Sequence, residues 1–278
     1  MAQSDFDFIP AADSPAPLDI ASVRDSLNCQ RLGGRFHYFS ELTSTNDYAR
    51  ELAENSAGEG EMVIAESQSQ GRGRLGRRWE SPPFANLYLS VILRPALAAI
   101  HAPQITLMAG VALAETVDSL IGQRPTIKWP NDILVKGRKL AGVLTEAACA
   151  SDRVEYVILG IGMNVNYAVD SMPVEIRHRA TSIANLVRAE VDRQNVLTRL
   201  IHALDRCYGE LEAAGFEALR ARWESSFGLR GRRVRVESLD SIVIGRARGI
   251  DRGGALILED EQGMLQRIYA GDVISLET

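Results

Sequence analysis

Residues 71–79 read Gly71-Arg72-Gly73-Arg74-Leu75-Gly76-Arg77-Arg78-Trp79, so four arginines and three glycines fall within nine positions. Glycine lets a backbone bend closely around a ligand and adopt positive φ at little cost. The arginine guanidinium is a planar fork of donors that pairs with a carboxylate or a phosphate through two hydrogen bonds. The stretch therefore predicts a loop that wraps an anion. Taken alone, it is also typical of a solvated basic loop or of an arginine-glycine segment that binds RNA.

The chain around this loop is acidic. Its 278 residues carry a formal net charge of −5 and 6% of them are aromatic, whereas an RNA-binding regulator is expected to have a basic body and stacking aromatic side chains. A hydrophobic fraction of 46% and a charged fraction of 24% are typical of a soluble globular protein. The sequence contains no run of ~18 apolar residues and no basic start followed by an apolar segment. We therefore expect a cytoplasmic protein with no nucleic-acid or membrane partner.

The residue types that most often bind metals are scattered. Three cysteines and four histidines lie far apart, without the spacing of a disulfide framework or of a zinc site. A lone histidine is more often structural than a ligand. We therefore expect no dedicated metal site built from these side chains.

The patterns on either side of the loop predict a sheet with helices packed against it. Residues 154–165 form a near-continuous apolar run, which is typical of a central strand buried on both faces. Shorter strands are predicted at 35–42, 62–68, 86–94, 126–132 (broken by a proline turn), 133–135 and 140–146. Helices are predicted at 47–55, 103–121 and 192–214, with a short one near 20–27. From residue 231 onward, five short strands separated by turns predict a small antiparallel barrel.

The run Thr43-Ser44-Thr45-Asn46 stands at the start of the 47–55 helix. Serine, threonine and asparagine are preferred at helix N-caps because their side chains accept hydrogen bonds from free backbone N–H groups. A plain cap is the simpler interpretation. The functional interpretation is that spare hydroxyls and an amide at this helix start bind a polar ligand.

A second glycine-containing run, Gly160-Ile161-Gly162-Met163-Asn164, ends the long apolar strand. Two glycines are able to begin a dinucleotide-binding fingerprint, but Val165 stands where a further glycine is needed and no helix clearly follows. A Rossmann domain is therefore disfavoured.

Together, and in this order, the motifs of the chain resemble those of the biotin–protein ligases, or biotin–[acetyl-CoA-carboxylase] ligases. The motifs are 43–46, Gln68 with 71–79, Lys128-Trp129-Pro130-Asn131-Asp132, Arg138-Lys139-Leu140-Ala141-Gly142-Val143-Leu144 and 160–164. The resemblance covers roughly residues 36–276, and the arginine-glycine loop with the Lys-Trp-Pro-Asn-Asp run is its most specific part.

The resemblance implies an α/β (α+β) fold in which a small SH3-like β-barrel follows a mixed-sheet catalytic domain. We expect the catalytic domain at residues 35–228 and the barrel at 229–278. Residues 1–34 hold prolines and aspartates without clear periodicity and are predicted to form a flexible acidic arm. Some family members carry an N-terminal helix-turn-helix and repress transcription, and this arm is too short for one. The resemblance therefore implies the monofunctional type.

The resemblance also implies two half-reactions. The biotin carboxylate attacks the α-phosphorus of ATP, giving biotinyl-5′-AMP and pyrophosphate. A lysine of a biotin carboxyl carrier protein then attacks the mixed anhydride. Because the first step brings a carboxylate up to a phosphate of like charge, the site needs cations and Mg²⁺ bound with ATP. By their positions in the motifs, Arg72 and Lys139 are expected at the carboxylate and α-phosphate, and Arg74 at the adenylate.

The remaining expected site residues divide by ligand. The ureido ring of biotin needs donors and acceptors at one end of an apolar slot. For biotin we expect Ser44, Thr45, Asn46, Gln68, Gly71, Arg72, Lys139 and Gly142. For ATP and the adenylate we expect Arg72, Arg74, Trp79, Asn131 and Asn164. Trp79 and Trp129 offer apolar walls, although ordinary core packing explains either residue as well.

Asp132 is the third expected catalytic residue, with Arg72 and Lys139. Its carboxylate is suited to orient the acceptor lysine and help remove its proton, or to help hold Mg²⁺. A plain turn carboxylate is the simpler alternative. The 71–79 loop has the composition of a lid that is flexible alone and ordered once its arginines bind anions, which keeps water from the anhydride.

Other interpretations compete with this one. Lipoate–protein ligases share the fold and the reaction type, but the arginine-rich motif belongs to the biotin side. A catalytically dead biotin-binding sensor is disfavoured because Lys139 and Asp132 are intact. Homodimers occur in the family, and no pattern in the sequence demands one. The sequence does not identify the acceptor protein.

Overall fold

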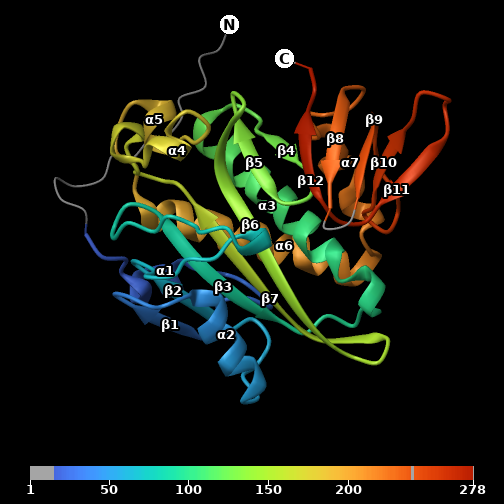
Figure 1. Cartoon of the computed structure of the whole chain (residues 1–278). Helices are drawn as coiled ribbons and strands as arrows, with labels where there is room; N and C mark the ends of the chain where they lie inside the picture. Colours follow the sequence, from blue (N-terminus) through green and yellow to red (C-terminus); the bar gives the residue numbers. More distant parts are fainter. Residues whose placement is uncertain (1–15, 239–240, 278) are drawn as a thin grey trace, which may run out of the picture.

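The computed structural model describes residues 16–238 and 241–277, which form a seven-stranded mixed sheet and a separate five-stranded antiparallel sheet. In Figure 1 the long strands of the larger sheet cross the middle of the molecule, and the smaller sheet stands at the upper right in orange and red. The two sheets confirm the expected fold class.

The large sheet has the strand order β1-β2-β3-β7-β6-β5-β4. Strands β1 and β2 run parallel, whereas each of the other neighbouring pairs is antiparallel. The predicted central strand is β7, which lies between β3 and β6, so its apolar run is explained by burial. The bounds are β1 Phe36–Phe39, β2 Met62–Ala65, β3 Leu87–Leu93, β4 Thr126–Lys128, β5 Asp132–Val135, β6 Arg138–Ala150 and β7 Arg153–Met163.

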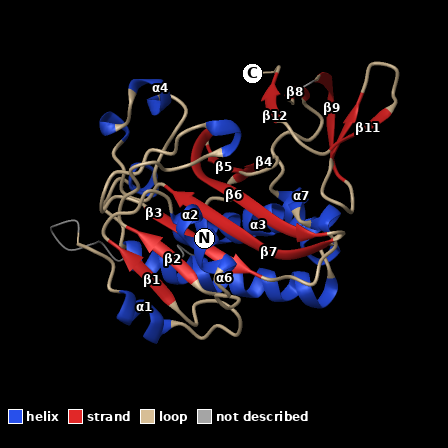
Figure 2. Ribbon diagram, turned by 60° about the horizontal axis from the view of Figure 1, so that its bottom comes forward, coloured by secondary structure: helices blue, strands red, loops and turns tan. Residues whose placement is uncertain are grey.

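Helices cover both faces of the large sheet. Helices α3 and α6 pack against each other on one face, and α2 lies on the other (Figure 2). The alternation of side chains along β7 shows this arrangement: Leu159 belongs to the main core with α3 and α6, whereas Ile158 packs with Ala49 of α2. The bounds are α2 Thr45–Glu54, α3 Pro103–Ile121 and α6 Arg193–Ala214, each close to its predicted range.

Helix α3 is apolar nearly all round because strands of the sheet, α6 and α7 (Glu217–Ser225) surround it. By length and composition, Ala99–Ile121 would suffice to cross a membrane, but 72% of its most apolar window is buried inside the fold. The helix ends at Gly122, whose φ of 62° gives a left-handed C-cap. Its apolar composition is therefore that of a core helix.

The C-terminal sheet has the order β11-β10-β9-β8-β12 with antiparallel pairing throughout. The indole N–H of Trp129 donates to the carbonyl of Gly254 at 3.1 Å and joins this sheet to the catalytic domain. The five strands confirm the predicted barrel, and the domain boundary at 228/229 stays a prediction. The bounds are β8 Arg233–Glu237, β9 Ile242–Ile250, β10 Leu256–Glu259, β11 Leu265–Ile268 and β12 Asp272–Ser275.

The N-terminal segment differs from the prediction. Helix α1 (Ile20–Ser26) forms close to the expected place and contacts α6. Leu18, Val23 and Leu32 are buried, and the N–H of Leu18 donates to Glu66 Oε1 at 2.7 Å. A flexible arm over residues 1–34 is therefore wrong for residues 16–34, because widely spaced apolar side chains find a surface that no local pattern reveals. Residues 1–15 lie outside the described part of the chain.

Three short helices were not predicted from the sequence. They are α4 (Val174–Arg177), α5 (Ile183–Val187) and α7. Two of them span four or five residues, which is too short for a helical period to be read from the sequence.

Candidate active site

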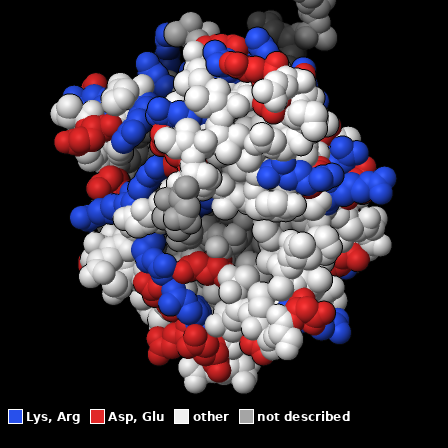
Figure 3. Space-filling view, turned by 45° about the vertical axis from the view of Figure 1, so that its right-hand side comes forward, with Lys and Arg blue, Asp and Glu red and all other residues white. Residues whose placement is uncertain are grey.

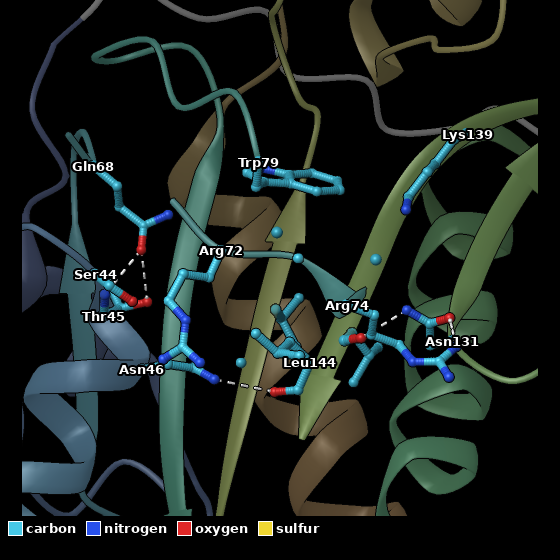
Figure 4. A pocket seen from close by; sticks show the side chains of 16 residues that line it. Ser44, Thr45, Asn46, Gln68, Arg72, Arg74, Trp79, Asn131, Lys139 and Leu144 are labelled. Atoms are coloured by element: carbon cyan, nitrogen blue, oxygen red, sulfur yellow. Dashed lines mark hydrogen bonds between the residues drawn. The ribbon is translucent and has the colours of Figure 1, made fainter. Parts of the chain in front are cut away.

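A cavity lies over β7 and β6, on the face of the sheet that α2 covers (Figure 4). Residues paired across these two strands form its floor: Gly160 with Leu144 in one row, and Gly162 with Gly142 in the next row on the same face. Ten of the expected site residues line it: Ser44, Thr45, Asn46, Gln68, Arg72, Arg74, Trp79, Asn131, Lys139 and Gly142.

Two glycines of the floor are required because other side chains lie directly against them. A Cβ at Gly160 would stand 2.0 Å from Oδ1 of Asn46, and a Cβ at Gly162 would stand 2.4 Å from Cε2 of Trp79. Gly142 pairs with Gly162 across the sheet and also touches the indole. Because these glycines lie inside strands, they are not a dinucleotide-binding turn.

The start of α2 forms one wall. Ser44 is the N-cap and accepts a hydrogen bond from a first-turn N–H, as the simpler interpretation predicts, and it also lines the cavity. The backbone N–H and the hydroxyl of Thr45 donate to Gln68 Oε1 at 2.9 and 3.1 Å. The hydroxyl of Ser90 donates to Asn46 Oδ1 at 2.7 Å. This network fixes donors and acceptors at one end of the cavity.

The 71–79 loop closes on itself. The N–H of Trp79 donates to the carbonyl of Gly71 at 2.9 Å. Positive φ falls at Leu75 (56°) and Gly76 (70°), which form the turn at its tip. Gly71 is required for space, because a Cβ there would stand 2.4 Å from the carbonyl oxygen of Trp79. The loop is therefore an ordered hairpin that reaches over the cavity.

Two arginines of this loop already pair with protein carboxylates. Nη1 of Arg72 lies 2.5 Å from Oδ1 of Asp47, and Nη2 lies 2.7 Å from Oε1 of Glu146. Burial lowers the pKa of Arg72, but these two carboxylates raise it overall. Arg77 pairs with Asp272 of the barrel. These two loop arginines thus have carboxylate partners within the protein itself, and the closure of the loop over ligand anions stays a prediction.

Arg74 has a different environment. Its Nη1 donates to Oδ1 of Asn131 at 3.1 Å, and Nδ2 of Asn131 donates to the carbonyl of Val143 at 2.9 Å. Burial lowers the pKa of Arg74, an effect that Asp272 and Asp132 oppose. The hydrogen-bond partner of this half-buried cation is a neutral amide, and the carboxylate of Asp272 stands farther off, at 3.9 Å from Nη1. Arg74 is therefore well suited to receive a ligand anion.

A larger cavity adjoins the first across Trp79 and Lys139, which line both. Nζ of Lys139 lies 2.6 Å from Oδ1 of Asp132, an ionic contact without hydrogen-bond angles, and 5.3 Å from the centroid of the Trp79 ring. Within the described residues, the buried Nε1 of Trp79 has no hydrogen-bond partner. The shared wall thus offers a cation, a carboxylate and an unused donor where two ligands would meet.

Asn164 lines the second cavity but is largely committed to the fold. The residue is 7% exposed, its Nδ2 donates to the carbonyl of Thr181 at 3.0 Å, and its Oδ1 accepts from Asn86 at 3.3 Å. Its contact with the adenylate stays a prediction. Trp129 is 2% exposed and bonded to the barrel, so core packing accounts for most of its surface.

The structure adds three residues that the sequence interpretation missed. Ser90 is fully buried beside the cavity, where its hydroxyl contacts Thr45 and Asn46, and a lone hydroxyl in an otherwise apolar strand was the available signal. Glu146 lies two residues beyond the floor residue Leu144 on β6, and a charge in a predicted strand was the signal. Asp272 gave none, because its contact with the loop depends on how the barrel is placed.

No cluster of three or more histidine, cysteine, aspartate or glutamate side chains suited to a metal ion occurs among residues 16–238 and 241–277. Asp132 lines the second cavity, and its buried Oδ1 is in ionic contact with Lys139. One carboxylate together with substrate phosphates is a common way of holding Mg²⁺. The residues present therefore fit a magnesium ion that arrives with a nucleotide.

Comparison with known proteins matches both parts of the chain. Residues 38–164 match the Biotin/lipoate A/B protein ligase family, and residues 230–275 match the Biotin protein ligase C terminal domain. A Biotin--[acetyl-CoA-carboxylase] ligase of Mycobacterium tuberculosis is 37% identical over 94% of this chain and 96% of the relative. The chain belongs to the biotin–protein ligase family. The C-terminal match sets it apart from lipoate ligases, the nearest competing interpretation.

Two further proteins resemble this biotin–protein ligase, one in sequence and one in fold. The Bifunctional ligase/repressor BirA of Bacillus subtilis is 37% identical over 93% of this chain and 79% of the relative. The biotin protein ligase from Aquifex aeolicus, solved in complex with biotin and ATP, superposes with a TM-score of 0.76 at 26% identity. The match covers 88% of this chain and all of that one.

Proposed function

We propose that this ligase forms biotinyl-5′-AMP from biotin and ATP in the two adjoining cavities and transfers biotin to a lysine of a biotin carboxyl carrier protein. The observation that carries the proposal is the shared wall, where Lys139, Asp132 and Trp79 stand between a smaller cavity and a larger one. Family membership supports the reaction, and the geometry supports the assignment of residues to its steps.

Biotin is assigned to the smaller cavity. The hydrogen-bonded cluster of Ser44, Thr45 and Gln68 lies at one end and offers hydroxyl and amide groups to the ureido ring. Arg72, Arg74 and Lys139 border the same cavity, which places positive charge near the carboxylate of a bound biotin. A ligand with a neutral polar head and an anionic tail fits this arrangement.

ATP is assigned to the larger cavity. A carboxylate oxygen of biotin forms a bond with the α-phosphorus, the bond from that phosphorus to the bridging oxygen breaks, and pyrophosphate leaves. Lys139 and Arg74 line both cavities and are positioned to offset the negative charge of the two reacting groups. Asn131 orients Arg74.

Mg²⁺ bound with ATP would neutralise phosphate charge and align the leaving pyrophosphate. Asp132 is the residue that would help hold it, because its carboxylate lines the larger cavity, which is assigned to ATP. This role stays a proposal beside the role of Asp132 in transfer.

In the transfer step the acceptor lysine attacks the carbonyl carbon of the anhydride. An amide bond forms, the bond to AMP breaks, and the lysine nitrogen loses its protons. Asp132 lines the larger cavity beside Lys139. We assign Asp132 to attracting the incoming ammonium and accepting a proton from it.

The partners follow from this reaction. The acceptor is a carrier protein or domain of a biotin-dependent carboxylase, and we propose that transfer takes place in the cytoplasm. On the face shown in Figure 3, basic and acidic side chains are interspersed and form no broad basic field of the kind nucleic acids need. A homodimer and the absence of a nucleic-acid partner both stay predictions.

The test is incubation of the protein with biotin, α-labelled ATP and a carboxyl-carrier domain. Labelled biotinyl-AMP should form first, and biotin should then appear on one lysine of the carrier. A chain that binds biotin but makes no adenylate would be a sensor, and replacement of biotin by lipoate as the preferred substrate would reject the assignment of the small cavity.

A further inference from the structure

Arg72 crosses one end of the small cavity and is fastened on the far side. Its side chain lines the cavity together with Asn46 and Leu144, and it points from the loop toward Asn46 (Figure 4). Its guanidinium then meets Asp47 at 2.5 Å and Glu146 at 2.7 Å, two carboxylates that do not themselves line the cavity. The side chain of Arg72 therefore spans the end of the cavity, and two carboxylates of the protein hold its guanidinium.

Glu146 contacts two residues that line the cavity, Arg72 and Asn46. Oε1 accepts a hydrogen bond from Arg72, and Oε2 accepts one from Nδ2 of Asn46 at 2.8 Å. The register of the sheet explains this placement. Glu146 lies two residues after Leu144 on β6, so its side chain is on the same face of the sheet, just beyond the floor. It pairs there with Ile158 of β7.

The charges of this group balance. Arg50 lies 2.6 Å from Asp47 and 3.4 Å from Glu146, so two arginines and two carboxylates form a neutral cluster. Because Arg50 contacts both carboxylates independently of Arg72, neither anion depends on Arg72 alone for a cationic partner. A partly exposed cluster of this kind is also sensitive to ionic strength.

We propose that Glu146, assisted by Asp47, is a positioning residue that fastens Arg72 across the end of the biotin cavity and orients Asn46 within it. The pair thereby slows the escape of biotin and of the adenylate. This inference rests on the proposed function, because it assigns biotin to the small cavity. The contrary possibility is that the two carboxylates compete with the ligand carboxylate for Arg72, and the two ideas predict opposite changes in biotin affinity.

The test is direct measurement of biotin binding and dissociation, without ATP, for wild-type protein and single variants. Glu146→Gln should release biotin about tenfold faster or more, since a charge-assisted contact to Arg72 and the orientation of Asn46 are both weakened. Asp47→Asn should have a smaller effect, because Arg72 keeps Glu146. Glu51→Gln makes the same charge change at an exposed position of α2 and should match wild type.

Two readouts separate positioning from a general loss of structure. Biotin dissociation from the wild type should speed up with salt, and Glu146→Gln should lose most of that dependence. In an Arg72→Met background, Glu146→Gln should add little. If Glu146→Gln does not fold, Asp47→Asn and the salt dependence of the wild type decide the question.

The outcomes are distinct. Tighter biotin binding by Glu146→Gln would mean that the carboxylates compete with the ligand, and unchanged dissociation would mean that the fastening has no effect; either result overturns the inference. A wild-type protein that does not bind biotin at all would instead refute the proposed function.

Discussion

Replacing Gly162 by alanine tests how the glycine floor seats Trp79. The added Cβ would stand 2.4 Å from Cε2 and 2.7 Å from Nε1 of the indole, whereas ordinary contact begins at 3.4 Å. The ring must therefore move by about 1 Å. Gly142 and Lys139 also lie against it, so the ring cannot move without disturbing the wall between the cavities.

The size of the effect follows from overpacking, which costs about 1–3 kcal/mol when a side chain is forced from a tight site. Trp79 belongs to the loop and is only half-buried, so we expect the loop to shift while β7 stays in place. We expect the closed, ligand-bound state to bear this free-energy cost. Biotin and the adenylate should then bind about 5- to 140-fold more weakly. The melting temperature of the free protein should change little.

Calorimetric titration with biotin and a filter assay for retained biotinyl-AMP measure this effect. Gly34→Ala is the matched control, because no atom lies within 4 Å of its added Cβ. If Gly162→Ala binds biotin and retains the adenylate as the wild type does, the indole is not held against the floor in the closed state. A large fall in melting temperature would instead show that β7 itself yields.

Four further predictions concern single steps or groups. Arg74→Gly should release biotinyl-AMP about one to two orders of magnitude more readily, because a charge-assisted pair worth about 1.5–3 kcal/mol is lost; trapping the leaked anhydride on a bystander protein measures this, and tighter retention would contradict it. Lys139→Ala should slow pyrophosphate release in single-turnover experiments. Asp132→Asn should still accumulate biotinyl-AMP but transfer it about 10²–10⁴ times more slowly, with the defect shrinking as pH rises toward the lysine pKa near ~10.4; equal loss of adenylation in both variants would make Asp132 a ligand of Mg²⁺ or ATP. Burial raises the pKa of Cys207 to about 11, so its thiol stays protonated and unreactive at pH 8 while the exposed Cys149 reacts, as native and denatured thiol titrations should show.

Local sequence patterns were sufficient for most of the fold. The apolar run 154–165 predicted a central strand, and the structure has β7 at Arg153–Met163 between β3 and β6. The apolar spacing over 103–121 and 192–214 predicted the two long helices, because the period of a helix is written in residues three or four apart. The motifs that resemble biotin–protein ligases named ten residues that the fold brings around one cavity.

Contacts between distant parts of the chain were not predictable in this way. Residues 16–34 looked like a flexible arm, yet Leu18 and Val23 are buried against the catalytic domain. The pattern Gly160-Ile161-Gly162 was correctly judged a poor dinucleotide fingerprint, but nothing in it revealed that Asn46 and Trp79 occupy the space the glycines leave.

The sequence by itself determined which residue types are available: an arginine-rich loop, an amide-bearing helix start, and a lysine near an aspartate. Only the tertiary structure decided which charges neutralise one another. Arg72 is fastened by Glu146, 74 positions away, and Arg77 by Asp272, 195 positions away. The physical reason is that side-chain periodicity is a property of neighbouring residues, whereas an ion pair depends on strand register and domain placement, which the whole core sets.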